Sequence, residues 1–438
     1  MKMLGRLVAL ILIVVIAAAC YGVYSIASSI PQPDIAPSLA QRQPDAARGK
    51  MVAILGDCAG CHTAPDGEAY AGGVGLATPV GTLYSSNITP DAENGIGRYD
   101  FQDFVRLMRF GVAPGGKRIY PAMPYTAYAK VSDEDLQDLF AYLRTGIAPS
   151  ARKTRPADIA WPLTMRWPLA LWNMAFHKTD RFRPDPAHDA EWNRGAYLVQ
   201  GLAHCGTCHT PRNAAFAEKG LDHTSALYLS GASFDGASPI NLRANPGDGL
   251  GLWSRDDIVQ LLKSGRNPHS AASGAMGEVI GLSTQYVGDA DLAAIAAYLK
   301  SLSSAPGDHA TFSPDAATLA AYLDGGQTGT GARIFMDSCS ACHRLGGQGA
   351  ATAFPGLAGN PMVLGRDPAS LIQAILAGSR LPSTEAAPSN LAMPGFGWRY
   401  DDAEIAALAT FLRSSWGNHA GPVSPGQVAE IRNRPGFR

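Results

Sequence analysis

The sequence has almost no surplus of charge of either sign. Its 36 Lys and Arg residues are matched by 37 Asp and Glu residues, and the formal net charge is −1 at pH 7. A protein that binds nucleic acid through its surface charge normally carries a basic excess. We therefore expect no nucleic-acid partner for this chain.

The sequence also lacks long runs in which polar and apolar residues alternate, the pattern typical of a half-buried β-strand. No glycine-rich phosphate loop, hydrolase triad or pair of acid/base carboxylates stands out either. We therefore predict an all-α fold with long loops, and we expect no catalytic residues. At 438 residues the chain is longer than one ordinary core, so several domains are expected.

Cysteine is scarce, and its distribution is the most informative feature of the chain. Six of the seven cysteines fall in three copies of Cys-x-x-Cys-His, namely Cys58-Ala59-Gly60-Cys61-His62, Cys205-Gly206-Thr207-Cys208-His209 and Cys339-Ser340-Ala341-Cys342-His343. This pentapeptide is the attachment motif of haem c, in which both thiols bind the porphyrin vinyl groups and the histidine ligates the iron. A structural zinc site would pair two Cys-x-x-Cys units in one small module, whereas these motifs lie far apart.

We therefore predict a cytochrome c with three covalently bound haem c groups. Their attachment residues are Cys58 and Cys61, Cys205 and Cys208, and Cys339 and Cys342. Their predicted iron ligands on the attachment side are His62, His209 and His343.

The sixth iron ligand separates an electron carrier from a haem enzyme, because methionine closes the second iron face and raises the reduction potential. In each repeat one methionine falls in a stretch rich in turn residues, which we expect to be a loop: Met123, Met276 and Met393. Pro124 and Pro394 follow two of them, whereas Gly277 follows Met276. Met276 is therefore the least certain ligand, with His269 and His223 as rivals.

The regions around the three motifs repeat as well, which indicates three similar modules. A first helix carries a glycine that would let another helix cross closely, at Gly49, Gly195 and Gly331. A second helix is expected over 101–110, 255–263 and 368–376. A closing helix repeats one apolar face in three versions, Leu136, Leu139, Phe140, Leu143; Leu292, Ile295, Ala296, Leu299; and Ile405, Leu408, Ala409, Leu412.

We predict three tandem cytochrome c-like domains over 47–148, 191–303 and 329–417. Residues 31–46 and 304–328 are expected to be linkers, and 418–438 a C-terminal tail. Residues 149–190 form an aromatic-rich linker with Trp161, Trp167 and Trp172. We expect this linker to pack between the first two domains, and the alternative is contact with a partner subunit, lipid or quinone.

The first thirty residues predict a membrane anchor or an export signal. After Lys2 and Arg6 no charged residue occurs before Asp34, and this run is long enough to span a bilayer. We favour an uncleaved anchor with its basic end inside. Cleavage after the small residues 17–19, or lipid modification of Cys20, remains open. Each alternative places residues from 31 onward outside the cytoplasmic membrane.

Three stretches of the sequence resemble the tri-haem cytochrome c subunits of bacterial membrane-bound dehydrogenases. They are Gly56-Asp57-Cys58-Ala59-Gly60-Cys61-His62-Thr63-Ala64-Pro65, then Ala77-Thr78-Pro79-Val80-Gly81-Thr82-Leu83-Tyr84-Ser85-Ser86-Asn87-Ile88-Thr89-Pro90-Asp91, then Tyr120-Pro121-Ala122-Met123-Pro124-Tyr125. The similarity covers about residues 47–417 and all three haem motifs. The family serves periplasmic alcohol, aldehyde, gluconate, sorbitol and fructose dehydrogenases.

The resemblance implies a specific role for the chain. A catalytic partner with a quinone, flavin or molybdenum cofactor oxidises the substrate, and the cytochrome passes the electrons to ubiquinone in the membrane. It implies His62, His209 and His343 as proximal ligands and Met123, Met276 and Met393 as distal ones. The expected place is the cytoplasmic membrane, with the haem domains facing the periplasm.

Two other functions remain open from the sequence. A peroxidase-like haem enzyme would need one open iron face, for which Met276 marks the only candidate site. A free-standing membrane-anchored carrier would connect other respiratory proteins without a dedicated dehydrogenase.

Overall fold

The computed structural model describes residues 2–233, 236–327, 329–351 and 353–434. These residues form two compact units. The first contains the residues up to Lys50 together with Cys61–Phe182, and the second contains Met51–Gly60 together with the residues from Arg183 onward. The second and third haem motifs therefore lie in one unit. The three domain boundaries drawn from the sequence stay a prediction.

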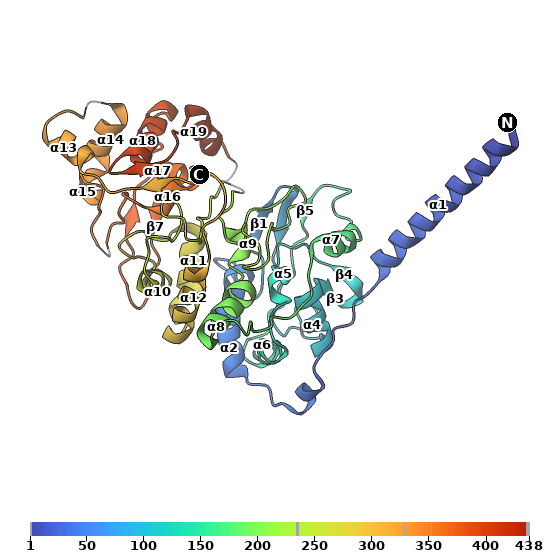
Figure 1. Ribbon diagram of the computed structural model, residues 1–438. Helices are drawn as coiled ribbons and strands as arrows, with labels where there is room; N and C mark the ends of the chain where they lie inside the picture. Colours follow the sequence, from blue (N-terminus) through green and yellow to red (C-terminus); the bar gives the residue numbers. More distant parts are fainter. Residues whose placement is uncertain (1, 234–235, 328, 352, 435–438) are drawn as a thin grey trace. The chain divides into compact units, whose positions relative to one another are not determined.

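The chain begins with helix α1 (Lys2–Ser28), which is labelled at the N-terminus in Figure 1. Its window Ile11–Ser28 is long and apolar enough to cross a membrane. Such a helix near an N-terminus has the length and composition of either an anchor or a signal sequence.

The first unit continues with short helices and strands that alternate with loops. Its elements are η1 (Pro37–Gln41), α2 (Ala46–Leu55), α3 (Cys58–His62), β1 (Gly75–Thr78), β2 (Gly81–Tyr84), α4 (Phe101–Phe110), β3 (Val112–Ala113), η2 (Pro114–Gly116), β4 (Lys117–Arg118), α5 (Tyr125–Tyr128), α6 (Asp133–Thr145), β5 (Asp158–Ile159) and α7 (Pro168–Phe176). The chain passes from one unit to the other within α2, after Lys50, and back again within α3, after Gly60.

The second unit holds two similar series of elements. They are α8 (Ala190–Tyr197), the π-helix η3 (Leu198–Leu202), α9 (Gly206–His209), α10 (Arg255–Ser264), α11 (Gly274–Leu282), η4 (Thr284–Tyr286), α12 (Asp289–Ser301), β6 (Thr311–Phe312), α13 (Ala317–Leu323), α14 (Thr330–Ser338), α15 (Ser340–His343), α16 (Pro361–Leu364), α17 (Ala369–Ala377), β7 (Ser379–Arg380), β8 (Ala392–Met393), α18 (Asp402–Ser414), β9 (Asn418–His419) and α19 (Pro425–Arg432).

The fold is mostly helical, as predicted, but it also contains short strands, so the prediction of an all-α fold is confirmed only in part. Strands β1, β2 and β5 form one antiparallel sheet, and three further pairs join β3 to β4, β6 to β9 and β7 to β8. Seven of these strands have only two residues. Strands of that length leave no period-two pattern in a sequence.

The same helix crossing occurs three times, between the first and the closing helix of each repeat. A Cβ atom added at Gly49 would lie 1.9 Å from the carbonyl oxygen of Asp138, and one added at Gly195 would lie 1.9 Å from that of Ala294. At Gly331 the distance to the carbonyl oxygen of Ala407 would be 2.2 Å. No side chain fits in these gaps, so the prediction of a close crossing at the three glycines is confirmed.

The closing helices α6, α12 and α18 each have 13 residues and begin with acidic residues. Asp401 caps α18 and forms a capping box with Glu404, and the Ser132 hydroxyl accepts the Asp135 N–H at the start of α6. Of the predicted apolar faces only Phe140 is half-buried, and the other eleven residues are buried. These faces form the cores that hold the repeats together.

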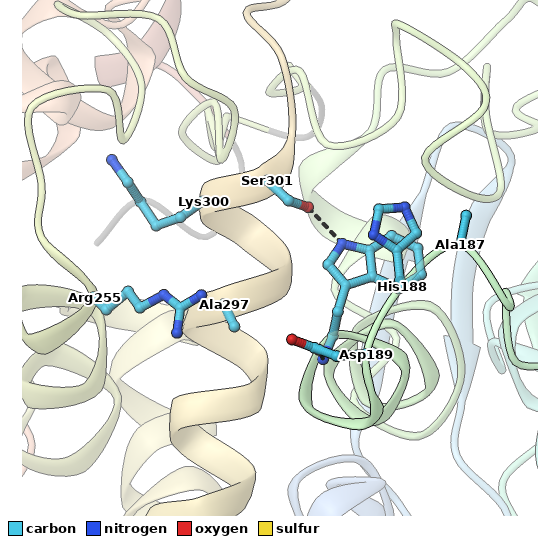
Figure 2. A pocket seen from close by; sticks show the side chains of 8 residues that line it. Ala187, His188, Asp189, Arg255, Ala297, Lys300 and Ser301 are labelled. Atoms are coloured by element: carbon cyan, nitrogen blue, oxygen red, sulfur yellow. Dashed lines mark hydrogen bonds between the residues drawn. The ribbon is translucent and has the colours of Figure 1, made fainter.

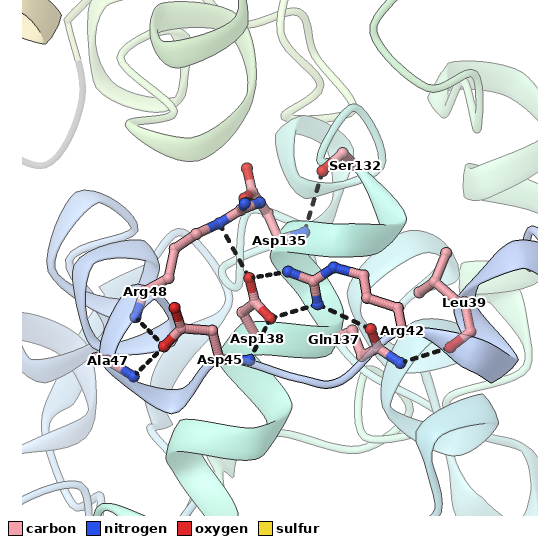
Figure 3. A network of polar contacts seen from close by, with 9 residues as sticks. All are labelled: Leu39, Arg42, Asp45, Ala47, Arg48, Ser132, Asp135, Gln137 and Asp138. Atoms are coloured by element: carbon pink, nitrogen blue, oxygen red, sulfur yellow. Dashed lines mark hydrogen bonds and ion pairs between the residues drawn. The ribbon is translucent and has the colours of Figure 1, made fainter.

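A polar network ties the predicted linker 31–46 to helix α6 (Figure 3). Arg42 donates two hydrogen bonds to the Asp138 carboxylate, at 2.6 and 2.7 Å, and the Asp45 N–H donates a third at 2.8 Å. Arg48 pairs with both Asp135 and Asp138, at 2.7 and 3.0 Å. This segment is therefore held on the first unit.

The other predicted connections also contain regular structure. The aromatic-rich linker 149–190 contains β5 and α7, and the linker 304–328 contains β6 and α13. The predicted tail forms β9 and helix α19, which buries Val428 and Ile431 against α17 and α18. Residues 328 and 435–438 lie outside the described part of the chain.

Candidate haem-binding sites

Each Cys-x-x-Cys-His motif occupies one short helical turn that follows the first helix of its repeat. The three turns are α3, α9 and α15. Cysteines three residues apart on one turn lie on the same side of it, as attachment to a single ring requires. The local sequence alone thus places both thiols and the imidazole of each motif.

The three motif histidines share one hydrogen bond. Nδ1 of His62 lies 2.7 Å from the Ser86 carbonyl oxygen, and Nδ1 of His209 lies 2.8 Å from that of Ile240. Nδ1 of His343 lies 2.9 Å from the carbonyl oxygen of Pro355. A neutral ring that donates from Nδ1 presents the Nε2 lone pair, so this arrangement fits an iron ligand.

Burial supports the neutral form of these rings. It lowers the pKa of His62, His209 and His343, while the carbonyl partner opposes the shift in each case. A neutral imidazole is the form that binds a metal ion. All three histidines are therefore in the protonation state that ligation needs.

Three thiols of the second and third motifs are also held neutral. Burial raises the pKa of Cys205 to about 12 and that of Cys339 to about 12, and it raises the pKa of Cys208. These cysteines are thus protonated at neutral pH, unlike the thiolates of a redox-active dithiol.

Met123 lies in a turn, as predicted. The turn connects β4 to α5, and the Tyr125 N–H donates to the Met123 carbonyl oxygen at 2.8 Å. Pro124 and Tyr125 are buried, whereas Met123 is half-buried. The backbone of the turn is therefore fixed while the thioether stays at the surface of the core.

Met393 lies in strand β8, opposite Ser379 of β7. The strand passes close to the end of α17, since a Cβ atom added at Gly378 would lie 2.4 Å from the Met393 carbonyl oxygen. Gly378 has a φ of +80°, a left-handed conformation that glycine adopts without strain. Met393 itself is therefore held in a two-residue strand and not in a loop as predicted, although the stretch that leads to it is irregular.

Met276 does not lie in a loop, so the prediction of its location was wrong. It lies in the first turn of helix α11 and is half-buried. The helix packs against Pro382, whose Cδ would lie 3.6 Å from a Cβ atom at Gly277. The composition of this stretch, which is rich in glycine, is typical of a loop. The contact with the third repeat favours a helix instead.

The two histidines that rival Met276 have other partners. His269 Nε2 lies 3.2 Å from Asp257, and the His269 ring stacks on Trp253 at 5.4 Å. The His223 ring contacts Trp192, and its Nδ1 lies 3.4 Å from the Gln200 amide. These contacts orient both rings within the second repeat, which leaves Met276 the better candidate.

The second repeat contacts residues of both other repeats within the second unit. His204, which precedes the second motif, places Nε2 3.3 Å from the carbonyl oxygen of Gly56, which precedes the first motif. Arg266 donates to the Ser389 carbonyl oxygen at 2.7 Å, close in sequence to Met393. Within the second unit, the second repeat is therefore bonded to the stretch before the first motif and to the loop of the third repeat.

A separate pocket of about 370 Å³ lies in the second unit (Figure 2). His188 stacks on Trp192 at 3.7 Å, and the Trp192 indole donates to Ser301 at 2.7 Å. Arg255 and Lys300 contribute cationic side chains to the lining. The lining residues include no motif cysteine or histidine and none of the three candidate methionines, and the sequence motifs gave no signal for this pocket.

Comparison with known proteins gives the following matches. The family model "Cytochrome c" matches residues 46–146 and 329–416, which contain the first and the third motif. The chain is 46% identical to the gluconate 2-dehydrogenase cytochrome c subunit of Pantoea cypripedii, over 88% of this chain and 89% of that protein. It is 44% identical to the cytochrome c subunit of alcohol dehydrogenase (quinone) of Gluconacetobacter polyoxogenes, over 96% and 90%. It is 34% identical to the fructose dehydrogenase cytochrome subunit of Gluconobacter japonicus, over 90% and 84%.

Proposed function

Because the chain belongs to the family of cytochrome c subunits of bacterial dehydrogenases, and is thus an electron-transfer rather than a catalytic subunit, we propose that it is a tri-haem relay to ubiquinone. The relay starts at a periplasmic dehydrogenase subunit and ends in the cytoplasmic membrane. The observation that carries this proposal is that the imidazoles of His62, His209 and His343 make the same hydrogen bond to a backbone carbonyl oxygen.

In this proposal each haem is attached through both cysteines of its motif. The iron ligands are His62 with Met123, His209 with Met276, and His343 with Met393. When bound, the haems supply iron centres that accept and release one electron at a time. Backbone carbonyl oxygens of this chain fix the three imidazoles, and the three methionines come from separate elements. Because the fold holds both kinds of ligand, the protein rearranges little when the iron changes its oxidation state.

The contacts of the second repeat support electron transfer between the second and the third site, which lie in one unit. The bond between Arg266 and Ser389 joins the second repeat to the loop that leads to Met393. We therefore place the second and third haems next to one another in the relay.

The partner is a catalytic subunit that oxidises an aldehyde, an alcohol or a sugar. The relatives are named for gluconate 2-dehydrogenase, alcohol dehydrogenase (quinone) and fructose dehydrogenase, and the partner's own cofactor would be molybdenum, a quinone or a flavin. Helix α1 supports a retained anchor with the haem domains on the periplasmic side.

Gentle detergent extraction of the native protein tests the proposal. We expect a dehydrogenase subunit to co-purify in stoichiometric amount, three haems per chain, and ubiquinone reduction with one of ethanol, acetaldehyde or gluconate. Purification of the cytochrome alone, with no such activity in the membrane fraction, would contradict the assignment.

One observation keeps a second function in view. Met276 lies on a helix, whereas Met123 lies in a turn and Met393 in a two-residue strand. If Met276 does not ligate, the second haem has an open face and a peroxidase-like activity follows. Rapid reaction of the reduced protein with peroxide would favour that function.

A further inference from the structure

The stretch Trp161–Phe176, here called the aromatic segment, exposes an unusual amount of apolar surface. Trp161 is 79% exposed and Met174 is 66% exposed. Four more large apolar side chains of the segment are also exposed, namely Leu163, Met165, Trp167 and Phe176. Several exposed apolar side chains on one short segment are typical of a contact with a partner or a membrane.

The backbone of the aromatic segment is held in place on the first unit. The Leu163 carbonyl oxygen accepts the Tyr120 hydroxyl, and Asn173 bonds to the Phe110 carbonyl oxygen at 2.9 Å and to the Tyr125 hydroxyl at 2.8 Å. Directly after the segment, His177 Nε2 lies 2.6 Å from the Arg109 carbonyl oxygen. The exposed side chains therefore project from a fixed support.

The aromatic segment lies next to the helix that is able to cross the membrane. Its helix α7 contacts α1, and Figure 1 shows α7 beside the C-terminal end of α1. Along α1 the residues 11–18 are exposed, whereas Ile26 and Ala27 are partly covered. The contact is thus at the C-terminal end of the apolar helix.

Very few residues separate the end of α1 from the first hydrogen bonds that hold the chain on the rest of the first unit. The apolar window ends at Ser28, and the next carbonyl oxygen, that of Ser29, accepts a hydrogen bond from the buried Arg118 at 2.8 Å. Two residues later the Pro31 carbonyl oxygen accepts from Arg106 at 3.1 Å. If α1 spans the membrane, the first unit is held at its surface.

We propose that the aromatic segment inserts into the outer surface of the cytoplasmic membrane and acts as a second, interfacial membrane contact beside α1. The proposal rests on the retained anchor of the proposed function. Tryptophan favours the interface, because its ring is apolar and its N–H stays near the lipid headgroups. The apolar side chains Leu163, Met165, Met174 and Phe176 would enter the acyl boundary.

The proposal also gives the first haem site a defined position. Tyr120, which bonds to the aromatic segment, begins the turn that carries Met123, and the Arg166 guanidinium lies 4.1 Å from the Tyr120 ring centroid. A membrane contact at the segment would therefore hold the methionine side of the first site close to the lipid surface.

Photo-crosslinking in the intact complex tests the inference. A benzoylphenylalanine is placed at Trp161 in the full chain, and at Trp398 as the matched control, because Trp398 is 83% exposed but lies in the second unit. Both proteins are reconstituted with their catalytic subunit into vesicles of phosphatidylethanolamine and phosphatidylglycerol. After illumination, mass spectrometry identifies what each probe has bound. A third protein with the probe at Met174 repeats the test if the Trp161 variant does not fold.

We expect lipid adducts at positions 161 and 174, at yields above the background that the equally exposed position 398 defines. Adducts with the catalytic subunit at 161 would show a protein interface instead, and the absence of any lipid adduct at both 161 and 174 would overturn the proposal. Carbonate washing of the same vesicles checks whether α1 anchors the chain. A chain that stays anchored but gives no lipid adduct contradicts the inference while leaving the proposed anchor intact.

Discussion

The two sides of each candidate haem site are built in different ways. On the attachment side, the three histidines make the same backbone contact at 2.7, 2.8 and 2.9 Å. On the other side, Met123 lies in a turn, Met276 in a helix and Met393 in a strand. The attachment side is encoded by five consecutive residues, whereas the position of each methionine depends on what packs against its loop.

The largest expected effect comes from disturbing the helix crossing beneath the attachment side. In Gly195→Val the new side chain would meet the Ala294 carbonyl oxygen, 1.9 Å from its Cβ, and the Tyr298 Cβ at 2.8 Å. Because helix backbone has to move, we expect a loss of about 3 kcal/mol or more in the free energy of unfolding. Denaturant unfolding followed by circular dichroism measures it.

Gly288→Val is the matched control for this variant. Gly288 is exposed, has a φ of −65°, and a Cβ atom there meets no atom within 4 Å. We expect a change below about 1 kcal/mol, from the loss of a favourable N-cap residue. Equal destabilisation by the two variants would show that the crossing does not depend on glycine.

A direct test of the methionine side replaces each candidate ligand by alanine. Met123→Ala and Met393→Ala should each lower the reduction potential of one haem, by on the order of 100 mV, because the thioether ligand is lost. Spectroelectrochemical titration of the purified complex measures these potentials. Met336→Ala, at an exposed position on α14, is the control and should leave them unchanged.

Met276→Ala decides whether the helical position differs in function from the other two. A shift of one potential similar to that of the other variants means that the helix presents its thioether to the iron. Three unchanged potentials would remove Met276 from the ligand set and favour the open second haem.

We expect a smaller loss of stability when a substitution breaks the polar network that is specific to the first repeat. Asp138 accepts two hydrogen bonds from Arg42 and one from the Asp45 N–H, and its side chain is fully buried. We expect Asp138→Asn to lower the free energy of unfolding by about 2 kcal/mol at pH 7, because Arg42 and Arg48 lose the buried carboxylate with which they pair. Chemical denaturation at pH 7 measures the difference.

The same variant predicts a pH dependence. Burial raises the pKa of Asp138, but the hydrogen bonds from Arg42 and Asp45 outweigh burial, so the folded pKa lies below the ordinary 3.8. The carboxylate therefore contributes its full stability above pH 3.8 and loses it as the pH falls through the folded pKa. The two proteins should converge in acid. A constant difference down to the lowest pH studied would contradict this assignment.

Several helices and their crossings could be read from the sequence because their signals are local. Helix α4 has the predicted bounds Phe101–Phe110, and α10 extends the predicted range by one residue. The crossing glycines and the acidic starts of the closing helices were also predicted, since each combines a short motif with the helical period.

The remaining features depend on contacts between distant residues. Two glycines in Gly274-Ala275-Met276-Gly277 predicted a loop, but packing against Pro382 accompanies helix α11 there. The strand pair of β2 with β5 joins Gly81 to Ile159 and leaves no signal in either stretch. The partners of the motif histidines are backbone carbonyls, which every sequence offers, so residue types could not identify them.

The smallest effect is expected at an ion pair that two repeats share. Arg48 pairs with Asp135 at 2.7 Å, and Arg194, also directly before a crossing glycine, pairs with Asp291 at 2.8 Å. The Arg194 and Asp291 side chains are 41% and 28% exposed, whereas Arg48 also pairs with the buried Asp138. Surface pairs of this kind contribute little, so Arg194→Ala should cost less than about 1 kcal/mol, and high salt should reduce even that difference. Arg48→Ala, measured by the same denaturant titration, should cost more because it also removes a contact to buried Asp138. If the two variants lose equal stability, the network in Figure 3 adds nothing to the crossing of the first repeat, and the glycine contact and the apolar face of α6 hold the two helices together.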